Sequence, residues 1–416
     1  MSVNKCLAVV LMLLVLPVPV LASGYGVFTQ GASGLGQANA VVAHTTGPSS
    51  AYFNPALLTQ VPGTQIEVGT TGIYAKNKVK LDSTGETQEG ERNWEFPSTF
   101  YLTHEVNDRL SVGLAVFSPF GLSAEWDDDD FEGRYIGTYG EITTANINPV
   151  LAFKVNDRIS IALGASAVYF DAELKSNIPQ FYLGSPDAKQ KFTGDDWGYG
   201  YNLGLTAKLS DSLTFGAAYR SKIELDAEGK VTFSGVDPLV NVLIYNGALQ
   251  NSKGKTDVTL PQQVVAGLSC RFSENIIAEV GLRWEDWEST DELTLEFDSG
   301  LITEIPRDWR STWTYNIGGQ YRLSEVFAVN AGYLYGQNAV PGDTLDVLIP
   351  DTDAHLFTVG LEWRHGAWTI AGAGGYEYHE SRRKNNSVGS KFLAPNADGK
   401  YENEVYLVGI SVGYAF

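Results

Sequence analysis

The sequence has little cysteine and, beyond its N-terminus, no long apolar segment. Only two cysteines, Cys6 and Cys270, occur in 416 residues, which excludes a disulfide framework and a cysteine-based zinc site. No stretch after residue 21 offers the roughly 18 uncharged apolar residues that a membrane-spanning helix requires. Basic residues are also scarce, with 29 Lys and Arg against 49 Asp and Glu. The net charge of −20 argues against nucleic acid as a partner.

Motifs for catalysis and metal binding are equally sparse. The five histidines are scattered, and none has the paired spacing of a metal site. The G-x-S-x-G pattern at 409–413 places Ser411 inside an alternating strand, whereas a nucleophile elbow needs a strand–turn–helix. The acidic run Asp127–Asp130 has Glu132 where a calcium loop requires glycine, which favours a solvated loop over a cation site. We therefore expect no enzyme, no cofactor and no bound metal.

Residues 1–22 have the features of a secretory signal peptide. Lys5 gives a positive start, residues 7–21 are apolar and uncharged, and the segment ends with the small residues that signal peptidase requires. Pro17 and Pro19 argue against an N-terminal anchor helix, because proline interrupts helices. We expect an exported chain that begins after this segment.

Most of the remaining chain alternates apolar residues with small or polar ones. Between residues 159 and 169, for example, Ile161 and Leu163 share one face while Ser160 and Ser166 share the other. Such alternation is typical of half-buried strands. Many of these runs are about 9–12 residues long, which exceeds the usual strand of a soluble sandwich and suits a tilted membrane strand. The sequence therefore predicts an all-β fold.

Six short turns separate pairs of these alternating runs. Together with a first strand at 64–76 and a last strand at 401–416, they predict an antiparallel barrel of about fourteen strands. Short turns at one end and long loops at the other are typical of a transmembrane barrel, and a β-propeller, with four short strands per repeat, fits less well. The six turns are Asn107-Asp108, Asn156-Asp157, Ser210-Asp211, Ser273-Glu274, Ser324-Glu325 and His365-Gly366.

The last strand alternates without a break and ends at an aromatic residue, Phe416. We expect the machinery that assembles barrels to recognise Phe416. The predicted location is the cell outer membrane, in contact with membrane lipid and lipopolysaccharide. Both termini are then expected on the periplasmic side, where the short turns lie.

Residues 23–63 do not alternate and are rich in small residues. The segment is too apolar to remain solvated, so we interpret it as a small plug, or hatch, inside the lumen of a barrel formed by residues 64–416. A periplasmic tail or a small separate domain is the alternative interpretation.

Several motifs resemble the FadL-type family of outer-membrane channels for hydrophobic compounds. The motifs are "SGLG" at 33–36, "NPALLT" at 54–59, "FSPFGL" at 117–122, "LPQQVVAGL" at 260–268 and "VPGDTLDVLIPDTDAH" at 340–355. They follow the family order over nearly the whole mature chain. The resemblance implies a fourteen-stranded barrel with an N-terminal plug, and passive transport of long-chain fatty acids or, alternatively, of aromatic hydrocarbons. It also implies capture among the extracellular loops, a pocket near the N-terminus and release beside a kinked third strand.

The resemblance assigns ligand-binding roles to individual residues. Tyr25 matches an N-terminal aromatic residue that contacts ligand. Arg310 occupies the position of a base that binds a carboxylate, which is costly to bury without a cation. Lys175 lies one residue away from a second such position, where this sequence has Ser176.

The loop at 236–251 carries a run of apolar residues outside any predicted strand. An exposed apolar run is unfavourable unless it packs or binds something, so we expect a capture groove here. A loop helix that packs on the barrel mouth is the alternative. The candidate ligand contacts are Leu239, Val242, Leu243 and Tyr245.

Two pairs of residues are candidates for gating. Ser118 and Pro119 lie in the predicted third strand, where proline removes a ladder hydrogen bond and suits a break or a strand end. Asn54 and Pro55 lie in the predicted plug, whose movement would open the path. One competing functional class is an outer-membrane enzyme such as a lipase-like barrel, but the sequence offers no Ser/His/acid set for it. Another is a structural or adhesive barrel with no transport activity.

Overall fold

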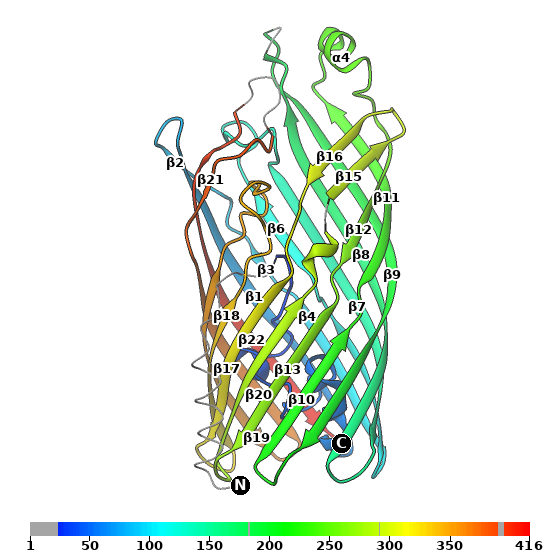
Figure 1. The fold of residues 1–416 in the computed structure, drawn as a ribbon, viewed down its shortest axis with the longest axis vertical. Coiled ribbons are helices and arrows are strands. Elements are labelled where there is room, and N and C mark those ends of the chain that lie inside the picture. The colour runs from blue at the N-terminus through cyan, green and yellow to red at the C-terminus, as the bar shows by residue number, and fades with distance from the viewer. Residues whose placement is uncertain (1–23, 182–183, 291, 390–394) are drawn as a thin grey trace.

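The computed structural model describes residues 24–181, 184–290, 292–389 and 395–416, so the expected signal peptide lies outside the described residues. The described strands form one antiparallel sheet that closes on itself (Figure 1). Strand β1 (Thr64–Leu81) pairs with β22 (Gly399–Ala415), from Gln65 opposite Ala415 to Leu81 opposite Gly399. The predicted all-β barrel of fourteen strands is therefore confirmed.

Between β1 and β22, each span of the barrel is one strand or a few consecutive strands in line. In chain order the spans are β2 (Thr87–Glu89), β3 (Trp94–Glu95) and β4 (Ser98–Asn107); β5 (Leu110–Phe117) and β6 (Gly121–Glu125); β7 (Tyr139–Lys154); β8 (Ile159–Ile178); β9 (Ala188–Lys208); β10 (Leu213–Arg220) and β11 (Ile223–Ser234); β12 (Ser252–Leu260) and β13 (Gln263–Arg271); β14 (Ile276–Glu285) and β15 (Glu292–Phe297); β16 (Ile302–Pro306) and β17 (Thr312–Arg322); β18 (Phe327–Gly336); β19 (Ala354–His365); and β20 (Trp368–His379) and β21 (Arg382–Lys384).

All six predicted short turns join neighbouring spans, and they lie at the end of the barrel where the chain terminates (Figure 1). Side chains stabilise them. The Asn107 side-chain oxygen accepts the backbone N–H groups of Arg109 and Leu110, at 3.0 and 3.1 Å. Asn156 caps its turn in the same way. Asparagine favours such turns because its short side chain hydrogen-bonds to the backbone two and three residues ahead.

The outer face of the barrel is apolar around its short-turn half. Leu163, Val359 and Val408 are 54, 66 and 61% exposed, and each belongs to the outward set of its strand. An apolar band of this kind is what a barrel presents to lipid. Among the described residues, no helix has the length and apolarity needed to cross a membrane.

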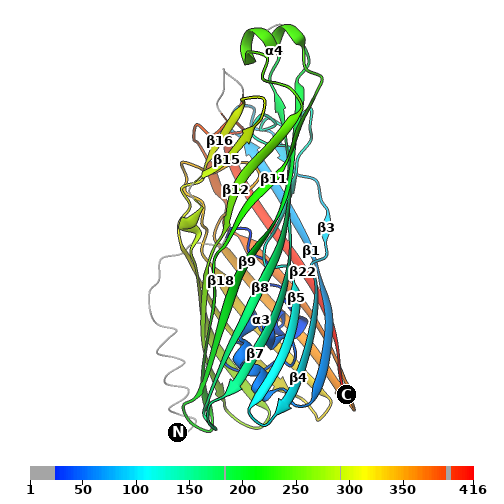
Figure 2. The ribbon, with the colours of Figure 1, turned by 90° about the vertical axis from the view of Figure 1, so that its right-hand side faces the viewer.

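Residues 24–63, called the plug below, lie inside the barrel (Figure 2). They contain two short α-helices, α2 (Ala32–Leu35) and α3 (Ser50–Phe53), and a 3-10 helix, η1 (Pro55–Gln60). Most of the plug is buried against the inner wall. The plug as a separate unit remains a prediction, which this position inside the barrel supports.

Buried carboxylates on the wall hold the plug backbone. Glu279 of β14 accepts the N–H groups of Val42 and Ala43, at 2.6 and 3.0 Å. Glu67 of β1 accepts the N–H of Ser49 at 3.2 Å, and Glu362 of β19 accepts the hydroxyl of Ser33 at 2.7 Å. Because each of these acids is 5% exposed or less, burial removes its hydrogen bonds to water, and the hydrogen bonds from the plug take their place.

Candidate functional site

The third span is broken between β5 and β6. Partners on β7 run regularly to Phe117 opposite Asn146 and resume at Gly121 opposite Thr143, so residues 118–120 make no ladder pairs with β7. Proline has no N–H to donate, which explains why the break falls at Pro119. Ser118 and Pro119 thus lie at a strand break, as the sequence predicted. Their role as a gate stays a prediction.

The first residues of the plug complete the hydrogen bonding at this break. The N–H of Val27 donates to the carbonyl of Pro119 at 2.9 Å, and the N–H of Gly121 donates to the carbonyl of Tyr25 at 3.0 Å. The Gln30 side chain donates to the carbonyl of Ser118 at 2.6 Å. Residues 25–30 therefore close the gap in the wall from the inside, in the manner of a short extra strand.

Four buried aromatic residues meet at the same place and form what we call the aromatic cluster: Tyr25, Phe120, Trp287 and Trp309. The ring of Tyr25 lies 4.8 Å from that of Trp287 and 5.7 Å from that of Trp309. Phe120 and Trp287 meet edge to face at 6.0 Å, an arrangement that aromatic rings favour. The cluster joins the plug, the broken span, the 3-10 helix η3 (Trp287–Ser289) that follows β14, and the connection between β16 and β17.

The aromatic cluster contains two polar groups without a partner. The indole N–H groups of Trp287 and Trp309 are buried and make no hydrogen bond to any described residue. A buried donor without an acceptor costs about 1–3 kcal/mol. An oxygen atom of a ligand placed between the rings would remove that cost.

Three arginines lie beside the aromatic cluster. Arg307 pairs with Asp346. Arg382 donates to the carbonyls of Val340 and Asp351, at 2.7 and 2.9 Å. Arg310 is exposed, and its side chain makes no ion pair within the described part of the chain. Burial lowers the pKa of Arg382, the nearby carboxylates of Asp351 and Asp353 raise it, and the charge of Arg310 lowers it. Because Asp351 and Asp353 offset the charge of Arg382 and Asp346 that of Arg307, Arg310 is the arginine of the three that is left to pair with a ligand carboxylate.

A cavity of about 440 Å³ lies beside the break. Plug residues 24–29 line one side, and apolar residues of β1 and β22 line another. Its lining contains no lysine or arginine, and besides Tyr25 its titratable residues are His379, Glu91, Glu95, Glu125, Glu141 and Glu377. Neutral apolar molecules suit this cavity better than a free carboxylate, which the glutamates would repel.

Lys175 lies away from the aromatic cluster. It belongs to the set of alternate β8 residues that includes the exposed Ile161 and Leu163, and its ammonium group pairs with Glu173 at 3.0 Å. The structure therefore brings Tyr25 and Arg310 to one region and leaves Lys175 outside it. Ligand binding by Lys175 stays a prediction without structural support.

The apolar loop forms helix α4 (Pro238–Tyr245) at the outermost tip of the molecule (Figures 1 and 2). The Asp237 side chain caps it by accepting the N–H groups of Leu239 and Val240. Leu239, Val242 and Leu243 are 58, 62 and 64% exposed, whereas Tyr245 is half-buried. The bare apolar face is compatible with capture of a hydrophobic molecule, which stays a prediction.

Asn54 and Pro55 lie at the start of η1. The Asn54 side-chain oxygen accepts the N–H of Ala56 at 3.1 Å, and its amide donates to the carbonyls of Val42 and Leu205. Because Leu205 belongs to β9, Asn54 connects two parts of the plug to the wall. This position fits the predicted role in gating, which no observation yet tests.

Residues that the sequence patterns did not single out complete the site. Trp287, Trp309 and Phe120 form most of the aromatic cluster, and the Asp351 carboxylate accepts the N–H of Gly24 at 3.0 Å. The available signal was the occurrence of tryptophan in otherwise polar loops, as in "EDWEST" at 285–290 and "RDWR" at 307–310. Spacing alone could not show that these loops fold inward.

The G-x-S-x-G pattern around Ser411 and the acidic run Asp127–Asp130 have structural explanations. The Ser411 hydroxyl accepts the N–H of Ala32 at 2.9 Å and so anchors the plug. In the run Asp127–Asp130, Lys189 pairs with Asp128 and Asp129 at 3.0 and 3.4 Å. Within the described residues, no group of three or more His, Cys, Asp or Glu is placed to hold a metal ion.

Comparison with known proteins identifies the family. The model of the outer membrane protein transport protein family (OMPP1/FadL/TodX) matches residues 13–416. The chain belongs to this family. It is therefore an outer-membrane transport protein of the FadL/TodX family, a channel for hydrophobic compounds rather than an enzyme, and the resemblance of its motifs is confirmed.

Relatives of this FadL/TodX-family protein cover it almost completely. A long-chain fatty acid transport protein of Escherichia coli O6:H1 is 24% identical over 436 residues, which span 95% of each chain. The crystal structure of a Pseudomonas aeruginosa FadL homologue superposes with a TM-score of 0.85 at 21% identity, covering 95% of this chain and 100% of that one. The toluene transporter TodX of P. putida gives 0.76 at 18% identity, covering 95% and 99%. These two structures support the fold.

Proposed function

We propose that this protein carries long-chain fatty acids across the outer membrane without an energy source. The observation that carries the proposal is Arg310, an arginine without an ion pair among the described residues, which lies near Arg382 and directly follows Trp309 of the aromatic cluster. A fatty acid needs an apolar surface for its chain and a cation for its carboxylate. The printed name of the E. coli relative, a long-chain fatty acid transport protein, supports the same substrate.

The route follows from the arrangement of the elements. The exposed apolar face of α4 takes up the substrate at the cell surface, and the aromatic cluster holds it beside the break in the third span. Movement of residues 25–30 away from Ser118 and Pro119 would then open the wall, because those residues supply the hydrogen bonds that close it. Release sideways into the membrane through this opening completes the path.

A second candidate substrate is a neutral aromatic hydrocarbon. The cavity beside the break favours it, because five glutamates and no lysine or arginine line that cavity. The likeness to the toluene transporter TodX is compatible with this alternative. The two candidate substrates differ in whether their transport depends on the arginines beside the aromatic cluster.

Uptake by cells that lack the gene separates the candidates. Labelled oleate and, separately, labelled toluene are supplied to cells with the chain restored as wild type, as Arg310→Ala or as Lys175→Ala. We expect restored oleate uptake that falls about tenfold in Arg310→Ala, the scale of one lost charged contact, and stays unchanged in Lys175→Ala.

Other outcomes have definite meanings. Restoration of toluene uptake alone, with no effect of Arg310→Ala, would establish a hydrocarbon channel. If neither compound entered although the barrel was correctly inserted, transport of both classes would be refuted and a structural role favoured.

A further inference from the structure

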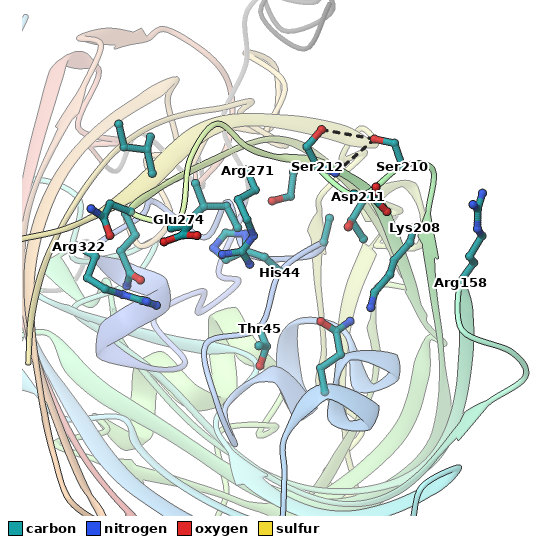
Figure 3. Close-up of a pocket in the computed structure, with 18 of the residues that line it drawn as sticks. His44, Thr45, Arg158, Lys208, Ser210, Asp211, Ser212, Arg271, Glu274 and Arg322 are labelled. Carbon is teal, nitrogen blue, oxygen red and sulfur yellow. Dashed lines mark hydrogen bonds between the residues drawn. The ribbon is translucent and has the colours of Figure 1, made fainter. Parts of the chain in front are cut away.

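A second cavity, of about 560 Å³, lies at the short-turn end of the barrel, beneath the plug (Figure 3). Plug residues 43–45 form its roof, and its walls come from five hairpins: those joining β7 to β8, β9 to β10, β13 to β14, β17 to β18 and β19 to β20. We call it the periplasmic cavity. The proposed transport path, which leaves through the side of the barrel, does not use it.

Basic side chains surround the periplasmic cavity. Arg158, Lys208, Arg271 and Arg322 line it, are exposed, and make no ion pair with any described residue. Two acids of the lining, Asp211 and Glu274, also make no ion pair within the described part of the chain. The other charged residues of the lining are paired: Asp157 with Lys154 and Arg364 with Glu362. In a chain with a net charge of −20, an excess of unpaired cations around one opening is a local reversal of sign. The cavity beside the break, by contrast, contains no lysine or arginine.

The cations are spread around the opening rather than gathered at one point. In Figure 3, Arg322 and Arg158 lie on opposite sides of the cavity, with Arg271 and Lys208 between them. Backbone hydrogen bonds hold these residues in place, because each of them lies next to a hairpin, where backbone groups of neighbouring spans still bind one another. The N–H of Lys208 donates to the carbonyl of Arg158 at 2.7 Å, and the N–H of Arg322 donates to the carbonyl of Asn275 at 2.8 Å.

We propose that the periplasmic cavity docks an acidic peptide segment of a periplasmic protein. A single phosphate or carboxylate contacts only the cations that converge on it, whereas charges distributed over several hairpins match an extended anion that carries several carboxylates. The cavity opens to the side of the membrane on which such a protein is found, since the short turns of outer-membrane barrels face the periplasm.

The docked segment would lie against the plug. His44 reaches the roof of the cavity and contacts the Glu279 carboxylate at 2.8 Å, and Glu279 also holds the backbone of Val42 and Ala43. A negatively charged segment in the cavity would therefore come close to His44, which contacts the Glu279 carboxylate that holds the plug. The docking site is independent of which hydrophobic compound the barrel carries.

The test measures binding of a fluorescent octa-glutamate peptide to the purified full chain in detergent, by fluorescence anisotropy. We expect binding that weakens as salt is raised, because salt screens exposed charges. The double variant Arg271→Gln and Arg322→Gln should bind at least about fivefold more weakly. A matched double variant, Lys80→Gln and Lys253→Gln, loses the same charge from exposed positions on β1 and β12 and should bind as the wild type does.

Three results would overturn the proposal. An octa-glutamine peptide that binds equally well would show that charge is not recognised. Equal losses in the two double variants would show a general effect of net charge. Competition by inorganic phosphate at the same concentration as the peptide would show a site for small anions only. Unchanged folding of both variants is checked by the heat-dependent gel mobility of the barrel.

Discussion

Glu279 holds the middle of the plug through hydrogen bonds from Val42, Ala43 and His44, and its replacement by glutamine tests how the plug is docked. Glutamine has the same shape but only one accepting oxygen. At least one buried N–H then loses its acceptor, at a cost of about 1–3 kcal/mol. The bonds that remain also lose the assistance of the negative charge, which roughly doubles a hydrogen bond's strength.

A loss near 3 kcal/mol predicts that the plug around residue 42 opens locally about 100-fold more often. Amide hydrogen exchange, followed by mass spectrometry of a peptide covering residues 40–47, measures this opening directly. Glu274→Gln is the matched control, because Glu274 is exposed on the hairpin that precedes β14 and its side chain makes no hydrogen bond within the described structure.

Unchanged exchange at residues 40–47 in Glu279→Gln would refute the reasoning that this carboxylate anchors the plug. Faster exchange that extended equally along β14 would also contradict it, since the barrel wall rather than the plug contact would then have weakened. The informative result is faster exchange confined to the plug, with the control variant identical to the wild type.

Three further variants test the aromatic cluster and its surroundings. Trp287→Ala removes the ring that contacts both Tyr25 and Phe120 and should weaken binding of oleate and of toluene about tenfold; equilibrium dialysis that showed unaltered binding would exclude the cluster as the substrate site. Gly24→Ala places a methyl group 2.7 Å from the Trp287 ring at a φ of +52°, so hydrogen exchange of residues 24–30 should accelerate, and an unchanged rate would contradict the close packing. Burial raises the pKa of Asp351, which lies in a loop outside the membrane spans, to about 6. The folded protein therefore binds this proton more tightly than the unfolded chain, and the carboxylate destabilises the fold above about pH 6 and ceases to do so below about pH 4. Asp351→Asn keeps an oxygen for the N–H groups of Gly24 and Ala339. At pH 8 the unfolding temperature of this variant should exceed that of the wild type, by an amount equivalent to at most about 3 kcal/mol, and at pH 4 the difference should vanish. Equal differences at both pH values would show that the charge is not involved.

The barrel could be predicted from the sequence because its pattern is local. Alternation of residues decides which side of a strand faces lipid, and a short asparagine turn such as Asn156-Asp157 needs only its own neighbours to form. The same reasoning placed a break or a strand end at Pro119, since a missing N–H is a property of the residue itself.

The site could be predicted only in part, because its members meet through long-range contacts. Tyr25 and Trp287 are far apart in the chain, and Trp287 lies in a 3-10 helix that alternation does not describe. Lys175 shows the limit of transferring a position that differs by one residue: in a strand, one step turns the side chain to the opposite face, and Lys175 pairs there with Glu173.

The plug contacts also concern the order in which the molecule assembles. Glu67 lies on β1 and Ser411 on β22, the two strands whose pairing closes the ring, and both bind the plug backbone, at Ser49 and at Ala32. The plug therefore links β1 and β22 to each other on the inner side of the barrel. A barrel that paired its first and last strands before the plug entered would have to admit some forty residues through its short-turn end. We therefore expect pairing of β1 with β22 and docking of the plug to stabilise each other, so that substitutions at either anchor delay barrel assembly as well as loosen the plug.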